Sequence, residues 1–251
     1  MSAAVQPRAD AEVIWHEVEC GGYAEDLRLW EELAAEAGGP VLDLGCGSGR
    51  VALHLARRGT AVHGVDASPA LVEALRAYAG AGGLVVTATT ADVREIELDL
   101  GAYPLALAPT QLMQLLGGAA GRTAALERVA HGLSPGGILA CAVIEDYEEG
   151  LGEPIPDVVP DVREQGGWIY SSLPTAVVDF GQAFEICRLR QTVSPEGRLS
   201  DAEHTDRLDV LDASTLEREA AAAGLVAAGR RSTSHSDRHV GSTVVLLAKE
   251  A

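Results

Sequence analysis

Three glycines at alternate positions follow a short apolar segment in the stretch VLDLGCGSGR, residues 41–50. Residues 41–44 are apolar enough for a buried strand, and residues 49–59 have the apolar spacing of a helix that ends at a glycine. A strand that turns through glycines into a helix directs backbone N–H groups and the positive end of the helix dipole at one point. The stretch therefore predicts a site where a nucleotide-like ligand lies against bare backbone.

Strand-like and helix-like segments alternate on both sides of this turn. We expect further strands at residues 61–68, 83–92, 103–110, 136–145 and 241–250, and helices at residues 21–39, 69–80, 119–133 and 213–225. Such alternation predicts a parallel sheet covered by helices on both faces.

The alternation stops after residue 145. Residues 150–167 are rich in proline and glycine and predict a long loop or lid. Three strand-like segments at residues 168–180, 182–194 and 198–212 are joined by short turns, which is typical of an antiparallel sheet. We therefore expect one α/β domain over residues 1–146 and 212–251, with an antiparallel β cap inserted as residues 147–211.

Composition excludes several kinds of partner. The formal net charge is −18 and the only lysine is Lys249, so the mean electrostatic field repels nucleic acid. No run of about 18 apolar residues occurs and the first residues do not resemble an export signal, so we expect a cytoplasmic protein that does not enter a membrane. The four cysteines form no CxxC pair, and we expect neither a metal site nor a disulfide.

An acidic residue after the second predicted strand limits the kinds of ligand that fit the site. Asp66 lies 21 residues after Gly45, where a carboxylate can bind ribose hydroxyls. Two ligands fit this arrangement: a nicotinamide or flavin dinucleotide, and S-adenosylmethionine. The dinucleotide fingerprint separates its last two glycines by two residues, whereas Gly47 and Gly49 are separated by one.

Three further features distinguish the alternatives. Asp43 precedes the glycine turn, Asp92 follows the third strand, and a Pro135-Gly136-Gly137 turn enters the fifth strand. With them, the sequence resembles the class I S-adenosylmethionine-dependent methyltransferases over residues 23–143. The resemblance implies a Rossmann-like, doubly wound sheet of seven strands, mostly parallel with the last strand antiparallel. It also implies S-adenosylmethionine as cofactor and S-adenosylhomocysteine as product, and the alanine-rich, arginine-over-lysine composition is similar to actinobacterial members.

The resemblance assigns cofactor contacts by position. The backbone of Gly45 and Gly47 is expected beside the methionine part, with Asp43 near its ammonium group. The remaining contacts are expected around the ribose and adenine or beside the reacting end. The complete implied set is Tyr23, Asp43, Gly45, Cys46, Gly47, Asp66, Ala67, Asp92, Val93 and Ala108.

The acceptor side departs from the family pattern. Pro104 stands where the fourth strand often carries an aspartate, and neither a DPPY-like nor an NPPY-like tetrapeptide is present, which disfavours methylation of nucleic-acid bases. Residues beyond the carboxyl ends of the strands, or on the cap, are expected to contact the acceptor. These are Gln111, Gln114, Tyr147 and Tyr170.

A general base is needed only if the acceptor enters protonated. The candidates are His16, Glu145 and His204, with His235 considered as well. Each has a structural alternative: His16 as a partly exposed loop residue, Glu145 in a solvated acidic turn, and His204 on either face of its strand.

The sequence thus predicts an enzyme that transfers a methyl group from S-adenosylmethionine to a nitrogen, oxygen or carbon nucleophile of a small molecule, acting as a monomer or homodimer. Two alternatives stay open. One is an NAD(P)-dependent reductase, and the other is a protein that binds the cofactor without turnover.

Overall fold

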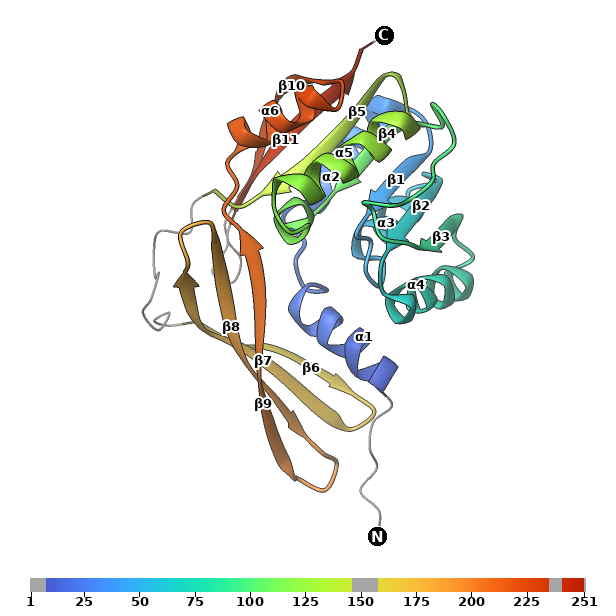
Figure 1. The fold of residues 1–251 in the computed structure, drawn as a ribbon. Helices are drawn as coiled ribbons and strands as arrows, with labels where there is room; N and C mark the ends of the chain where they lie inside the picture. The colour runs from blue at the N-terminus through green and yellow to red at the C-terminus, as the bar shows by residue number, and fades with distance from the viewer. Residues whose placement is uncertain (1–7, 146–157, 235–240, 251) are drawn as a thin grey trace.

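The computed structural model describes residues 8–145, 158–234 and 241–250. They form a seven-stranded sheet of order β10-β11-β5-β4-β1-β2-β3 and a separate four-stranded sheet of order β6-β7-β8-β9 (Figure 1). In the larger sheet, β11 runs antiparallel to both of its neighbours and the pairs from β5 to β3 are parallel. The predicted fold class is confirmed.

The order of strands in the larger sheet places the candidate site. Its strands are β1 (Val41–Leu44), β2 (Val62–Asp66), β3 (Val86–Thr90), β4 (Tyr103–Ala108), β5 (Leu133–Val143), β10 (Leu225–Thr233) and β11 (Ser242–Lys249). β1 lies between β4 and β2, so the carboxyl ends of these parallel strands meet at one edge. In open α/β sheets, ligands bind outside this edge.

Helices cover both faces of the larger sheet. They are α2 (Leu27–Ala37), α3 (Arg50–Ala56), α4 (Pro69–Gly82), α5 (Ala119–Gly132) and α6 (Ala213–Ala222), with a short 3-10 helix η1 (Leu112–Leu115) after β4. The helices α2, α3 and α4 pack on one face with Trp30 fully buried, and α5 and α6 pack on the other with Leu126 fully buried. The two apolar layers hold the strand ends in fixed positions.

The cap has one more strand than the sequence predicted. It consists of β6 (Asp161–Gln165), β7 (Trp168–Asp179), β8 (Ala183–Val193) and β9 (Leu199–Asp209), all antiparallel. β6 falls inside residues 150–167, which the sequence predicted as loop. Its five residues are mostly exposed and lack apolar alternation, so the pairing with β7 left no signal.

An additional helix, α1 (Arg8–Glu19), lies between the cap and the larger sheet (Figure 1). The prediction that His16 is a loop residue is therefore wrong. Ile14 and Val18 lie on one side of α1 and pack with Tyr170 of β7, which makes helix formation favourable for this segment. Over the residues that the structure describes, no helix has the length and apolar character needed to cross a membrane.

Candidate functional site

The bare turn predicted from the sequence lies at the carboxyl end of β1. Gly45, Gly47 and Gly49 have φ values of 64°, 54° and 101°, which residues with a Cβ rarely adopt. A Cβ at Gly49 would lie 2.4 Å from Leu75 of α4, so this glycine also allows close packing of the helices. The turn thus presents backbone without side chains at the edge of the sheet.

Asp66 connects the carboxyl ends of β1 and β2. One of its carboxylate oxygens accepts a hydrogen bond of 2.9 Å from Gly47 N, and the other accepts one of 2.9 Å from Ser68 N. Carboxylate oxygens accept more than one hydrogen bond each, so Asp66 retains acceptor capacity toward a ligand. Ala67, the next residue, is exposed at the same edge.

Asp43 is an unusual residue for the interior of a sheet. Its side chain is 1 % exposed, and neither carboxylate oxygen has a hydrogen-bond partner among the described residues. Burial raises the pKa of this carboxyl to about 7, and the nearby Arg50 and the backbone of Ala52 oppose the shift. Unpaired buried carboxylates are costly and rare, and a cationic ligand group beside the turn would satisfy this one.

We expect Asp43→Asn to stabilise the protein above pH 7 by roughly 1–3 kcal/mol. A carboxyl with a raised pKa binds more protons in the folded state, so its contribution to stability falls as the pH rises from about 4 to about 7. Three pKa units correspond to about 4 kcal/mol, and the unpaired amide of asparagine offsets about 1–3 kcal/mol of that gain.

Urea unfolding at several pH values checks this expectation. The gain should be absent below about pH 3, where Asp43 is protonated in both states. Asp99→Asn, at an exposed position, serves as the control and should show no pH-dependent gain. An Asp43→Asn variant that is less stable than the parent protein at pH 8 would show that the carboxylate has a stabilising partner.

His16 of α1 lies directly over the glycine turn. Its Nδ1 is 3.3 Å from Ser48 Oγ, and a Cβ placed on Gly47 would be 2.2 Å from its Nε2. Burial lowers the pKa of His16, while Asp66 opposes the shift, so the imidazole is neutral at pH 7. A neutral imidazole at this position can accept a proton.

A buried ion pair lies at the end of the turn, where α3 begins. Arg50, the first residue of α3, donates to both carboxylate oxygens of Asp26 at 2.5 and 2.8 Å and to Tyr23 O at 3.0 Å. Trp30 Nε1 donates to the same carboxylate at 2.7 Å. The Arg50 guanidinium also lies over the ring of Tyr23, whose hydroxyl donates to Thr233. Arg50 was not identified from the sequence, because its partner Asp26 lies 24 residues away in the chain.

The remaining predicted cofactor contacts differ in accessibility. Cys46, Val93 and Ala108 are buried around the carboxyl ends of the strands. Asp92 is partly exposed, and its carboxylate accepts hydrogen bonds from the backbone and guanidinium of Arg94. Contact of these residues with a cofactor stays a prediction.

Two residues predicted on the acceptor side are engaged elsewhere. Gln114 Nε2 donates to the carbonyls of Ile144 and Asp209, and its Oε1 accepts from Ile144 N. Glu145 Oε1 accepts from Ala213 N at the start of α6. In this conformation Gln114 and Glu145 therefore join β5 to the following elements, and contact of either residue with an acceptor stays a prediction.

The other acceptor-side predictions have varied outcomes. Gln111 is partly exposed directly before η1, next to Thr110, which has a φ of 52°. Tyr170 is buried, with its ring 5.8 Å from that of Trp15 in an edge-to-face arrangement. His204 of β9 lies 3.1 Å from Asp206 through its Nε2. Tyr147 and His235 lie outside the described residues.

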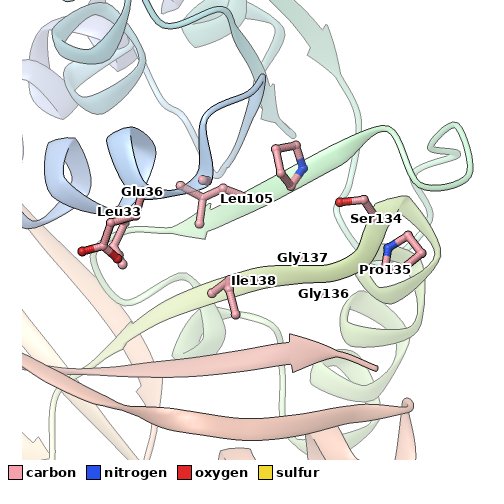
Figure 2. A pocket seen from close by; sticks show the side chains of 10 residues that line it. Leu33, Glu36, Leu105, Ser134, Pro135, Gly136, Gly137 and Ile138 are labelled. Atoms are coloured by element: carbon pink, nitrogen blue, oxygen red, sulfur yellow. The ribbon is translucent and has the colours of Figure 1, made fainter. Parts of the chain in front are cut away.

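A hollow of 290 Å³ lies at the opposite edge of the sheet (Figure 2). It is lined by residues at the end of α2 and at the starts of β4 and β5, namely Leu33, Glu36, Ala37, Pro104, Leu105, Ser134, Pro135, Gly136, Gly137 and Ile138. It therefore does not belong to the site at the glycine turn.

Part of the chain matches a known protein family. Residues 41–137 match a family described as a methyltransferase domain. This segment runs from the first residue of β1 into β5 and includes the glycine turn, Asp66 and Asp92. The resemblance to S-adenosylmethionine-dependent methyltransferases predicted from the sequence is confirmed.

The chain is also similar to individual methyltransferases and a related enzyme. The carboxy-S-adenosyl-L-methionine synthase of Aliivibrio salmonicida is 31 % identical over 149 residues, covering 57 % of this chain and 60 % of that protein. The chain thus matches less than two thirds of this relative's length. The sugar N-methyltransferase KedS8 from Streptoalloteichus is 18 % identical with a TM-score of 0.75, covering 100 % of this chain and 96 % of that one.

A third comparison involves CalS10 from Micromonospora echinaspora, an amino pentose methyltransferase solved with S-adenosylmethionine bound. It is 17 % identical with a TM-score of 0.70, covering 99 % of this chain and 100 % of that one. At this identity the likeness shows a shared fold.

Proposed function

We propose that this chain binds S-adenosylmethionine at the carboxyl edge of its larger sheet and catalyses methyl transfer to a small molecule. The observation that carries the proposal is the buried, unpartnered Asp43 carboxylate beside the bare glycine turn. The family match over residues 41–137 and the presence of cofactor in the structural neighbour CalS10 support it.

The described residues fit the cofactor. Asp43 would bind its ammonium group, Asp66 would accept hydrogen bonds from its ribose hydroxyls, and the turn at Gly45 and Gly47 would allow its close approach. His16 covers Gly47 in this conformation, so binding would place the cofactor beside the imidazole or displace it. When bound, the cofactor supplies an electrophilic methyl group.

The protein's contribution is mainly positioning and exclusion of water. α1, whose His16 covers Gly47, packs against β6 and β7 of the cap, and a covered site aligns the acceptor and keeps solvent out. His16 is the group best placed to accept a proton from the acceptor, because its pKa is lowered and it lies at the turn. Glu145 would first have to release Ala213 N.

Among nitrogen, oxygen and carbon acceptors we favour an amine nitrogen. The support comes from two structural neighbours, one described as a sugar N-methyltransferase and the other as an amino pentose methyltransferase. A neutral His16 would serve such an acceptor, because an amine must lose a proton to leave as its methylated neutral form.

A labelled-methyl assay tests the proposal. The chain is incubated with methyl-labelled S-adenosylmethionine and separate sets of amino sugars, phenols and alcohols. We expect S-adenosylhomocysteine to form together with labelled amine, and Asp43→Asn to abolish both. Labelled phenol or alcohol without labelled amine would overturn the choice of nitrogen. Protection against unfolding by NADH but not by S-adenosylhomocysteine would overturn the proposal as a whole.

A further inference from the structure

The inner face of the cap carries a row of charged residues opposite the end of α1. The β7–β8–β9 register sets Arg190 opposite Ser172, and Arg188 opposite His204. Glu19, the last residue of α1, accepts hydrogen bonds from Arg190 Nε and Nη2 at 2.7 and 2.6 Å and from Ser172 Oγ at 2.7 Å. The fork of Arg190 is therefore fully used in attaching α1 to the cap.

Arg188, two residues earlier on the same face, has no such partner. Its side chain is 17 % exposed, and its Nε and Nη1 are buried without a hydrogen-bond acceptor among the described residues. Asp206 Oδ2 lies 3.5 Å from Nε, close enough to attract the charge but without a hydrogen bond. Buried donors without acceptors are costly, and guanidinium groups bind oxyanions through two parallel N–H groups.

The position of Arg188 relates it to the glycine turn. Cys20 N donates to His16 O at 2.9 Å, so the end of α1 lies one helical turn, about 6 Å, beyond the residue that covers Gly47. Burial raises the pKa of Cys20 to about 11, and the charges of both Arg50 and Arg188 oppose this shift. Glu19, the residue before Cys20, has a carboxylate oxygen within 4.8 Å of one of Asp206, and Asp206 lies 3.5 Å from Arg188 Nε, so the end of α1 lies between the turn and Arg188.

We propose that Arg188 is a specificity-determining residue that binds an oxyanion, carboxylate or phosphate, carried by the methyl acceptor. This inference rests on the proposed function, because it takes the acceptor to lie between the cap and the glycine turn. The oxyanion would take the place of Asp206, whose side chain is 40 % exposed and can turn toward solvent. Arg188 provides a local positive charge in a protein of net charge −18.

Titration of the whole chain, saturated with S-adenosylhomocysteine, tests the assignment. Inorganic phosphate and acetate are added separately while the Nε–H resonance of Arg188 is followed by NMR and the affinity is measured by calorimetry. We expect at least one anion to shift this resonance. Arg188→Met should weaken binding about tenfold or more, and Asp206→Asn should strengthen it several-fold by removing a competing carboxylate.

Arg207→Met is the matched control. Arg207 is 58 % exposed on β9, pairs with Glu185, and alternates in the strand with Asp206, so its loss should leave anion binding unchanged. A shift of the Arg188 resonance with phosphate alone or with acetate alone would support the proposal and identify the kind of oxyanion. The proposal is overturned if neither anion shifts the resonance, or if Arg188→Met binds the anion as tightly as the parent protein.

The two proposals fail separately in this experiment. Cofactor affinity is measured first, without anion, and should be the same for the parent protein and Arg188→Met. A protein that binds phosphate at Arg188 but does not bind S-adenosylhomocysteine would overturn the proposed function and leave the oxyanion site standing. Cofactor binding without any anion effect would overturn the role of Arg188 alone.

Discussion

Asp26→Ala is expected to lower the free energy of unfolding by about 3–5 kcal/mol. Asp26 is 2 % exposed, and its carboxylate accepts two hydrogen bonds from Arg50 and one from Trp30. Alanine would leave a guanidinium charge and an indole N–H buried without their partner. The loss should exceed the value of the ion pair itself, because desolvation of Arg50 is no longer compensated.

Denaturant unfolding measures this change, and an exposed ion pair on the same helix is the control. Arg28 and Glu32 pair through a hydrogen bond of 2.8 Å at side-chain exposures of 90 % and 51 %, so Glu32→Ala should cost no more than about 0.5 kcal/mol. If Asp26→Ala and Glu32→Ala are equally stable, Arg50 has another partner in the variant. The pair with Asp26 would then not be what stabilises the end of the turn.

Gly47→Val is expected to abolish binding of S-adenosylhomocysteine. Valine would have to adopt a φ of 54°, and its Cβ would lie 2.2 Å from the His16 ring atoms over the turn. The side chain would fill the surface against which the cofactor is proposed to lie. Calorimetry should show no heat of binding under conditions where the parent protein saturates.

Backbone strain alone is controlled with Gly181→Val. Gly181 has a φ of 79° in the turn between β7 and β8, and no atom lies within 4 Å of its added Cβ. This variant should lose stability but keep its cofactor affinity. Both variants must first show a cooperative unfolding transition, and a folded Gly47→Val protein that binds normally would contradict the role given to the turn.

Much of the larger sheet is predictable because its signals are local. Ser68 precedes Pro69 in the sequence, and in the structure its hydroxyl caps α4 by accepting from Leu71 N. Gly38 ends α2 with a φ of 66°, as the Gly38-Gly39 pair predicts. Apolar periodicity and capping residues thus place these elements without knowledge of their partners.

Elements stabilised by distant partners were not predictable. β10 is a sheet edge in which only the first and last residues are buried, so it lacks the alternation of a half-buried strand. α1 is attached through Glu17 to Arg163 and Tyr78, and through Glu19 to Arg190. These partners lie 61 to 171 residues away in the chain, so no local sequence pattern predicts the contacts.

The candidate site likewise contains residues that local sequence signals predict and residues whose contacts depend on distant partners. The glycine turn and Asp66 were identified from spacing, because the geometry of a strand, turn and helix is local. The contacts of Gln114 and Glu145 could not be predicted, because their hydrogen-bond partners Asp209 and Ala213 are distant in the chain and are brought close only by tertiary packing. Whether Arg188 faced the core or solvent depended on the cap register, which a shift of one residue would reverse.

The central claim is that the cofactor lies against Gly45 and Gly47 at the carboxyl edge of β1. A crystal structure of the chain grown with S-adenosylhomocysteine tests it most directly. We predict the ligand's ammonium group within hydrogen-bond distance of Asp43 and its ribose hydroxyls on Asp66. Density for the ligand in the hollow beside Pro104, or a glycine turn that carries no ligand at saturating concentration, would contradict the account.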